Sequence, residues 1–202
     1  MELMRVRKRH DLAVRGHKLL KDKLEGLIKE LTERLNAYKE LRLRVDERWP
    51  EVFQRFAMAD AQSARGAVET AVLQARPPVE VTTSIERIMG VAVPTCEATV
   101  KPGGHAYSLI ATSPHLDTAI RELNELLPDL IRLAALEQAV RALSAEIQRT
   151  RRRANALEYV VVPDLEEAKS YIVSRLEELA RADTSRLMKV KEMILSRESE
   201  AG

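Results

Sequence analysis

The sequence predicts a mainly α-helical protein, in which a long helix from each end of the chain forms an antiparallel two-helix coiled coil. A short segment containing a β-hairpin is expected between the two helices. Three observations support this fold class. Apolar residues recur at heptad spacing near both ends, and the region between them alternates like a strand. Charged residues make up 32% of the 202 residues and aromatic residues only 3%, a composition typical of long helices.

The N-terminal heptad pattern predicts a helix from about residue 10 to about residue 75, preceded by a loose segment over residues 1–9. Pro50 is expected to kink or interrupt this helix near Trp49, because proline removes a backbone hydrogen bond and its ring clashes with the preceding turn. Only Arg42 breaks the apolar seam. Steps of four and three residues define the seam as Leu24, Ile28, Leu31, Leu35, Tyr38, Arg42, Val45, Trp49, Val52 and Phe56.

The C-terminal heptad pattern predicts a second helix that starts near Ser113-Pro114 and reaches about Arg197. Ser113 is expected to cap it, and Pro114 suits the first helical position. Bends are expected at Pro128 and Pro163. The seam consists of Leu133, Leu136, Val140, Leu143, Ile147, Thr150, Ala154, Leu157, Val161, Leu165, Ala168, Ile172, Leu176, Leu179, Asp183, Leu187, Val190 and Ile194.

The middle of the chain predicts strands. Pro77-Pro78 should end the first helix, residues 79–83 alternate apolar and polar side chains, and residues 85–89 suggest a helical turn. Pro102-Gly103-Gly104 is interpreted as the turn of a hairpin between residues 97–101 and 105–110. The expected organisation is therefore an N-terminal helix over 1–76, a hairpin projection over 77–113 and a C-terminal helix over 114–202.

No catalytic constellation or cofactor motif is found in the sequence. The four histidines lack zinc-ligand spacing and no phosphate-binding GxxxxGK[ST] loop occurs, so we expect neither catalysis nor a cofactor. A single cysteine, Cys96, allows no intrachain disulfide. No signal peptide and no membrane-spanning apolar run are visible.

The most conspicuous charge cluster is Arg149 together with Arg151, Arg152 and Arg153. It fits a solvated helix face, a contact for an acidic partner, or a phosphate contact. The net charge of +2 and the lack of interleaved aromatic residues disfavour nucleic acid. Two other functions stay open for such a coil: a tether or prefoldin-like chaperone, and, less favoured, an RNA-binding helical arm.

Four segments resemble one family in the same order along the chain. Residues 151–163 resemble its RR(V/T)NALExxxxP signature, and residues 183–191 its DTFRLKRIK. Residues 86–94 resemble NIMGVxVP, and residues 12–23 resemble AxxGxxLLKxKRD. The family is the D subunit of the V-type and A-type ATPases. The chain departs from it at Leu24 and Glu25, where Arg and Asp are usual, at Ser185, where Phe is usual, and at Met188, where a base is usual.

The resemblance implies a non-catalytic central-stalk rotor shaft that transmits torque between a membrane ion-translocating ring and a catalytic hexamer. Implied partners are the nucleotide-binding A and B subunits, the F subunit and the C subunit (named d in eukaryotes), with no direct membrane insertion and no nucleic acid. The implied location is peripheral, on the cytoplasmic side of the membrane, and a prokaryotic source is expected.

Contact residues are expected at three places. The chain ends should meet at a basic tip that enters the hexamer, and Arg151–Arg153 should lie mid-shaft, beside residues 50–56. The hairpin projection should lie near the F subunit. The candidates are Arg15, Lys21, Arg186 and Lys189 at the tip, Arg151, Arg152 and Arg153 at mid-shaft, and Ile88, Met89, Val91 and Val93 on the projection.

Overall fold

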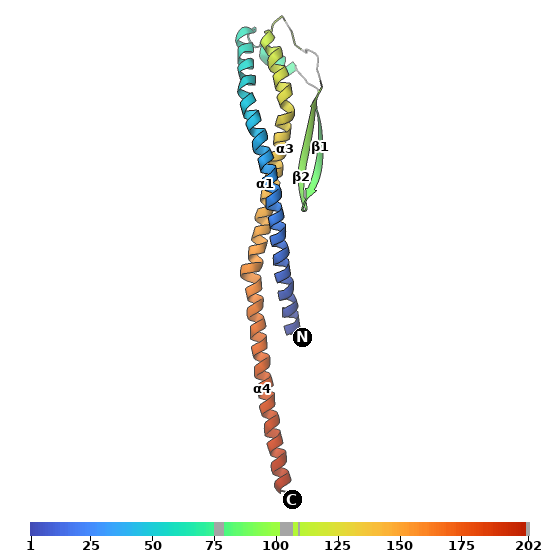
Figure 1. Cartoon of the computed structure of the whole chain (residues 1–202), viewed down its shortest axis with the longest axis vertical. Helices are drawn as coiled ribbons and strands as arrows, with labels where there is room; N and C mark the ends of the chain where they lie inside the picture. Colours follow the sequence, from blue (N-terminus) through green and yellow to red (C-terminus); the bar gives the residue numbers. More distant parts are fainter. Residues whose placement is uncertain (75–78, 102–106, 109, 201–202) are drawn as a thin grey trace. The chain divides into compact units, whose positions relative to one another are not determined.

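The computed structural model describes residues 1–74, 79–101, 107–108 and 110–200 (Figure 1). In chain order, its elements are helices α1 (Glu2–Gln62) and α2 (Ala67–Gln74), strands β1 (Val79–Ile88) and β2 (Val91–Val100), helix α3 (Pro114–Ala156), the π-helical turn η1 (Leu157–Val161), and helix α4 (Val162–Glu200). The predicted fold class, long helices with an antiparallel two-stranded hairpin between them, is confirmed.

The helix bounds correct two expectations. Helix α1 begins at Glu2, so residues 2–9 are helical and not loose, and it ends at Gln62 rather than near residue 75. It runs through Pro50 without a break, just as α3 runs through Pro128. The predicted Pro77-Pro78 boundary lies outside the described residues.

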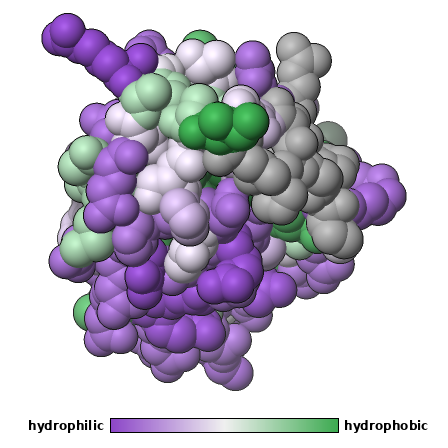
Figure 2. Space-filling model, turned by 90° about the horizontal axis from the view of Figure 1, so that it is seen from above, coloured by the Kyte–Doolittle hydropathy of each residue, from purple (hydrophilic) through white to green (hydrophobic). Residues whose placement is uncertain are grey.

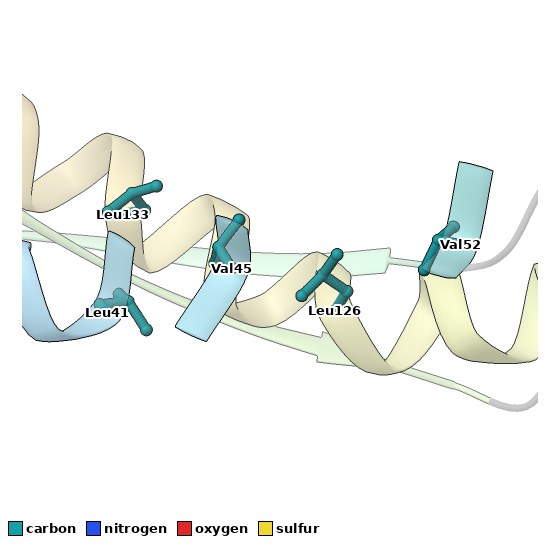
Figure 3. Packing of buried hydrophobic residues seen from close by; sticks show 5 residues of the cluster. All are labelled: Leu41, Val45, Val52, Leu126 and Leu133. Atoms are coloured by element: carbon teal, nitrogen blue, oxygen red, sulfur yellow. The ribbon is translucent and has the colours of Figure 1, made fainter. Parts of the chain in front are cut away.

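The chain divides into two compact units. One comprises residues 1–23 and 149–202, and the other comprises residues 24–148. In the second unit, α1 packs antiparallel against α3. Its main core cluster consists of Leu41, Val45, Val52, Leu126 and Leu133, whose side chains face one another from the two helices (Figure 3). Arg48 and Arg55 of α1 pair with Glu125 and Glu122 of α3, at 3.2 and 2.9 Å, beside this seam.

The predicted seam of α1 is correct in one column and displaced by one residue at two positions of the other, where Trp49 and Phe56 still pack on the core. Val45 and Val52 are buried, as the heptad predicts. Leu27 and Leu41, however, are buried in place of Ile28 and Arg42, which are exposed. Arg42 therefore does not interrupt the core: it lies on the surface, where its guanidinium binds the Asp46 carboxylate at 2.9 Å.

The hairpin turn lies at Met89-Gly90. Strands β1 and β2 pair without interruption from Val79↔Val100 to Ile88↔Val91, which leaves a two-residue turn. Both turn residues have positive φ, 50° and 89°, as a type I′ turn requires. The expected helical turn over 85–89 is wrong, because these residues end a strand. The predicted turn at Pro102-Gly103-Gly104 lies outside the described residues, and Tyr107, Ser108 and Ile110 belong to no strand.

The turn end of the hairpin packs onto α1 and α3. Val93 is fully buried with Leu27, Ala139 and Leu143, and Leu31, Ile88, Val91 and Ile147 pack around them. The Met89 side chain lies against the backbone of Gly26, where an added Cβ would come within 2.2 Å of its Cε. Arg34 of α1 binds Glu86 of β1 at 3.0 Å. This hydrophobic cluster thus fixes one end of the hairpin to the helices.

At its other end, the second unit is closed by a small apolar cluster. Ala59 of α1, Val68 and Ala71 of α2, and Leu116 of α3 are buried together, with Tyr107 beside them. The predicted cap at Ser113 is confirmed: its hydroxyl accepts the His115 backbone N–H at 3.4 Å. Seen from this end, the described surface is mainly hydrophilic with small separate apolar spots (Figure 2).

In the first unit, α1 packs antiparallel against η1 and α4. Leu157 approaches Gly16, where an added Cβ would lie 3.9 Å from Leu157 Cδ1. The π-helical turn directly precedes Pro163, which has no N–H and whose ring crowds the preceding turn of a helix. Val162 N–H instead donates to the Leu157 carbonyl, five residues back. The extra residue moves Val161 out of the predicted seam, and the neighbouring Val162 is half-buried instead.

Candidate partner-binding surfaces

Residues 174–194 of α4 are all exposed. His10 of α1 faces Glu166 of α4, and His17 faces Glu158 in η1. On this register, Glu2 lies opposite Ser174, and every residue from Ser174 to Ile194 is exposed. The expectation that the first and last residues meet at one tip is therefore wrong, because α4 continues past the start of α1.

This exposed stretch carries an apolar stripe. Its members recur at helical spacing and lie on one face of α4, as in a coiled-coil seam. Solvated helix surfaces are normally polar, so a stripe of this length indicates a surface that binds something. The stripe, called here the α4 stripe, consists of Leu176, Leu179, Leu187, Val190 and Ile194, and Asp183 occupies the seam position between Leu179 and Leu187.

The predicted tip residues do not form one cluster. Arg15 and Lys21 are exposed on the part of α1 that packs on η1 and α4, and the Arg15 Nε–H donates to the Asp11 carbonyl at 3.1 Å. Arg186 and Lys189 lie on the exposed stretch of α4, where Arg186 pairs with Asp183 at 3.3 Å. The structure thus separates the two pairs along the helices of the first unit.

Arg151, Arg152 and Arg153 are all exposed at the C-terminal end of α3. Extending the register of the His17–Glu158 pair places Arg153 opposite the region of Asp22. The expected position beside residues 50–56 is wrong, since that estimate assumed that the two chain ends coincide.

The four hairpin candidates have different environments. Val93 is completely buried against α1 and α3, and Ile88 and Val91 pack around it. Met89 is exposed at the turn, with its side chain over Gly26. Val93 therefore holds the hairpin on the helices, and Met89 is the most accessible of the four.

Sequence reasoning missed the polar pairs between α1 and the C-terminal helix. His10 Nε2 lies 3.3 Å from a Glu166 carboxylate oxygen, and His17 Nε2 lies 3.5 Å from Glu158. The histidines are seven residues apart, two helical turns, and so share one face of α1. This spacing was a signal in the sequence, but identifying the partners requires the register.

The described part of the chain offers no metal site and no membrane span. No group of three or more His, Cys, Asp or Glu residues there could hold a metal ion. None of the described helices is both long and apolar enough to span a bilayer.

These features define a helical coiled-coil protein with exposed surfaces for partners. The family model for the ATP synthase D subunit matches residues 2–192. The chain belongs to this ATP synthase D subunit family.

Relatives in both bacteria and archaea are similar over nearly their whole length. The V-type ATP synthase D subunit of Acetivibrio thermocellus is 40% identical over 96% of this chain and 90% of its own. The corresponding protein of Thermoanaerobacter pseudethanolicus is 39% identical, over 96% and 94%. The A-type ATP synthase D subunit of Thermococcus gammatolerans is 36% identical, over 98% and 94%.

Proposed function

We propose that this chain is the central-stalk rotor shaft of a V/A-type ATP synthase. It carries torque between the membrane ion-translocating ring and the catalytic hexamer, and so couples ATP synthesis or hydrolysis to proton or sodium transport. The chain itself is non-catalytic. The proposed partners are the A and B subunits, the F subunit and the C subunit (d), and the proposed location is peripheral, on the cytoplasmic side of a prokaryotic membrane.

The observation that carries the proposal is the exposed C-terminal stretch of α4. Its α4 stripe would remain in water in the isolated chain, at a cost of roughly 25 cal/mol for each Å² of apolar surface. Insertion into the central hole of a hexamer would cover it. Arg186, which lies beside the stripe, and Lys189, which lies further round the helix, are suited to polar or acidic loops around that hole.

The coupling follows from unequal contact. A shaft that touches one catalytic interface more than the others stabilises that interface in one nucleotide state, and a ligand shifts an equilibrium only through such differences. Nucleotide binding must in turn favour particular shaft orientations, because coupling is reciprocal. The apolar clusters between α1 and α3 give the second unit the packed core that resistance to twisting requires.

A matched pair of charge substitutions on α4 tests the proposal. Leu187→Glu places a carboxylate in the α4 stripe, whereas Ser185→Glu places the same charge near the opposite face of the helix. We expect Leu187→Glu to weaken retention of the chain by an A–B hexamer at least about tenfold, because an unpaired charge is costly to bury. Ser185→Glu should bind within about threefold of the unsubstituted chain. Equal binding by both variants would contradict insertion through this face.

Stoichiometry separates a rotor from a coiled-coil tether. After reconstitution with the A, B and F subunits, native mass spectrometry should find one copy of this chain per hexamer. Three or six copies would exclude a central shaft, because only one coil can occupy a central axis.

A further inference from the structure

The two faces of the β-hairpin have an unusual distribution of side chains. Alternation along paired strands places Glu86 on the face of Val93, which packs on α1 and α3. That inner face is apolar at the turn end, where Ile88 and Val91 join Val93. Further from the turn it is polar and carries the Ser84–Thr95 hydroxyl pair, at 2.6 Å. The opposite, outer face is mostly apolar and consists of Val79, Val81, Thr83, Ile85, Arg87, Ala92, Pro94, Cys96, Ala98 and Val100.

The outer face is accessible along β1. Ile85 is 70% exposed and Val81 is 49% exposed. A hairpin that merely capped the coil would turn its apolar face toward the helices and its polar face toward water. Away from the turn end the inner face is polar and the outer face is mostly apolar, the reverse of that arrangement. This indicates that the outer face is completed there by something outside this chain.

The backbone at the edge of β1 indicates what kind of segment could bind beside the outer face. Among the described residues, the sheet has two strands, so β1 has one edge without a neighbouring strand. In a two-residue hairpin, Ile88 and Val91 form a hydrogen-bonded pair, and pairs alternate from there. The backbone N–H and C=O groups of Val81, Thr83 and Ile85 therefore point to the free edge.

This edge lacks the features that usually prevent strand addition. Strand β1 has ten residues, contains no proline and pairs without a bulge. Strand β2, by contrast, has Pro94 opposite Ile85, at a position whose N–H would face the other edge. Only an extended backbone supplies donors and acceptors at the spacing that β1 presents.

We propose that an extended segment of another protein of the complex adds to the free edge of β1 as a third strand. The identity of the partner as a member of the same complex rests on the proposed function. Alternate apolar side chains of the added strand would extend the apolar outer face beside Val81 and Ile85. Arg87 is the only charge on that face, so the strand should carry an acidic residue near the turn end of the hairpin.

Hydrogen–deuterium exchange tests the added strand directly. The full chain is compared alone and after assembly with the A, B and F subunits, and exchange is followed in peptides that cover β1. We expect exchange of the outward amides of Val81, Thr83 and Ile85 to slow at least about tenfold on assembly. Unchanged exchange in an assembled complex would overturn the added strand and leave the rotor proposal intact.

Two other outcomes would also contradict the added strand. Protection of β1 in the chain alone, rising with protein concentration, would show that a second copy occupies the edge. Failure of the chain to assemble with the A, B and F subunits would overturn the proposed function and this inference with it.

A backbone substitution isolates the hydrogen bonds. Thr83→Pro removes one outward N–H and leaves the bonds between β1 and β2 in place, whereas Thr83→Val keeps that N–H in a similar shape. We expect assembly to protect β1 in Thr83→Val and not in Thr83→Pro. Exchange of β2 in the isolated variants verifies that the hairpin is intact. If Thr83→Pro loosens β2, the variant Ile85→Lys is used in its place. Assembly that still protects the β1 amides and retains the partners in Ile85→Lys would refute the added strand.

Discussion

Two glycines of α1 face different surroundings, although both occupy helical positions. At Gly16, an added Cβ would make ordinary van der Waals contact with Leu157. At Gly26, an added Cβ would overlap the Met89 Cε and Sδ atoms, at 2.2 and 2.8 Å. Gly26 therefore provides the space in which the hairpin turn rests, whereas Gly16 has room for a methyl group.

Alanine substitutions at these glycines should have different effects. Gly16→Ala should increase the free energy of unfolding by about 0.5–1 kcal/mol, because alanine favours the helix. Gly26→Ala gains the same helix propensity but must displace the Met89 side chain, so its free energy of unfolding should change little. The backbone amides of the hairpin turn should exchange faster in this variant. Thermal melts and hydrogen exchange of both variants check this, and equal stabilisation would argue against the Met89 contact.

Tyr107 should titrate differently from an exposed tyrosine. Burial, and then its hydrogen bond to the Asp117 carboxylate, raises the pKa of the Tyr107 phenol above its ordinary value. In the unfolded chain this tyrosine loses its proton near pH 10. The interaction thus stabilises the fold below pH 10, and this contribution declines as the pH rises above 10.

Absorbance at 295 nm measures this titration. One of the four tyrosines should ionise later than the others, and Tyr107→Phe should remove that late phase. The variant should also lose about 1 kcal/mol of stability near neutral pH, the net worth of a typical hydrogen bond. A late phase that survives in the variant would assign it to another tyrosine.

At the scale of elements, the π-helical turn η1 inserts one residue into an otherwise helical seam. It lies directly before Pro163 and leaves Tyr159 and Val160 exposed. The heptad predicts Val161 in the seam because it assumes constant helical geometry, and the five-residue step from Leu157 to Val162 violates that assumption.

Replacing Pro163 should restore regular helix. Pro163→Ala supplies an N–H for the Tyr159 carbonyl and removes the ring clash, so the free energy of unfolding should rise by up to about 3 kcal/mol. Crystal structures of the variant and the unsubstituted chain would show whether residues 157–161 return to α-helical hydrogen bonding. Persistence of the π turn would mean that packing against α1, and not proline, maintains it.

At the scale of the whole molecule, little surface is buried. The accessible area is 15001 Å², whereas a compact monomer of this mass exposes roughly 9,600 Å². Hydrophobic stabilisation grows with the area removed from water, so the isolated chain should be only marginally stable.

Assembly should therefore raise the melting temperature. Partner proteins at about 100 times their dissociation constant add about 2.7 kcal/mol, which corresponds to roughly 5–10 °C for a chain of this size. This chain is labelled at one site, so that the fluorescence follows its own unfolding. Differential scanning fluorimetry of the labelled chain, alone and with the A, B and F subunits, measures the change in melting temperature. A melting temperature independent of partner concentration would contradict support by assembly.

The sequence by itself determined the long helices, the antiparallel pairing, the central strands and the family. The signals behind them are local in the chain: heptad spacing, proline and serine caps, and the motifs over 151–163 and 86–94. It placed Arg186 and Lys189 on the last helix, and the structure keeps them there on its exposed stretch.

Only the tertiary structure decided the features that depend on register. Leu27 and Leu41 replace Ile28 and Arg42 because helix rotation depends on what packs opposite. Glu166 lies opposite His10, so α4 continues past α1, and the expected alignment of the arginine cluster with residues 50–56 is lost. The sequence did not predict the turn at Met89-Gly90, because methionine rarely adopts positive φ. Packing of Met89 over Gly26 and of Val93 in the core stabilises this backbone conformation in the folded chain.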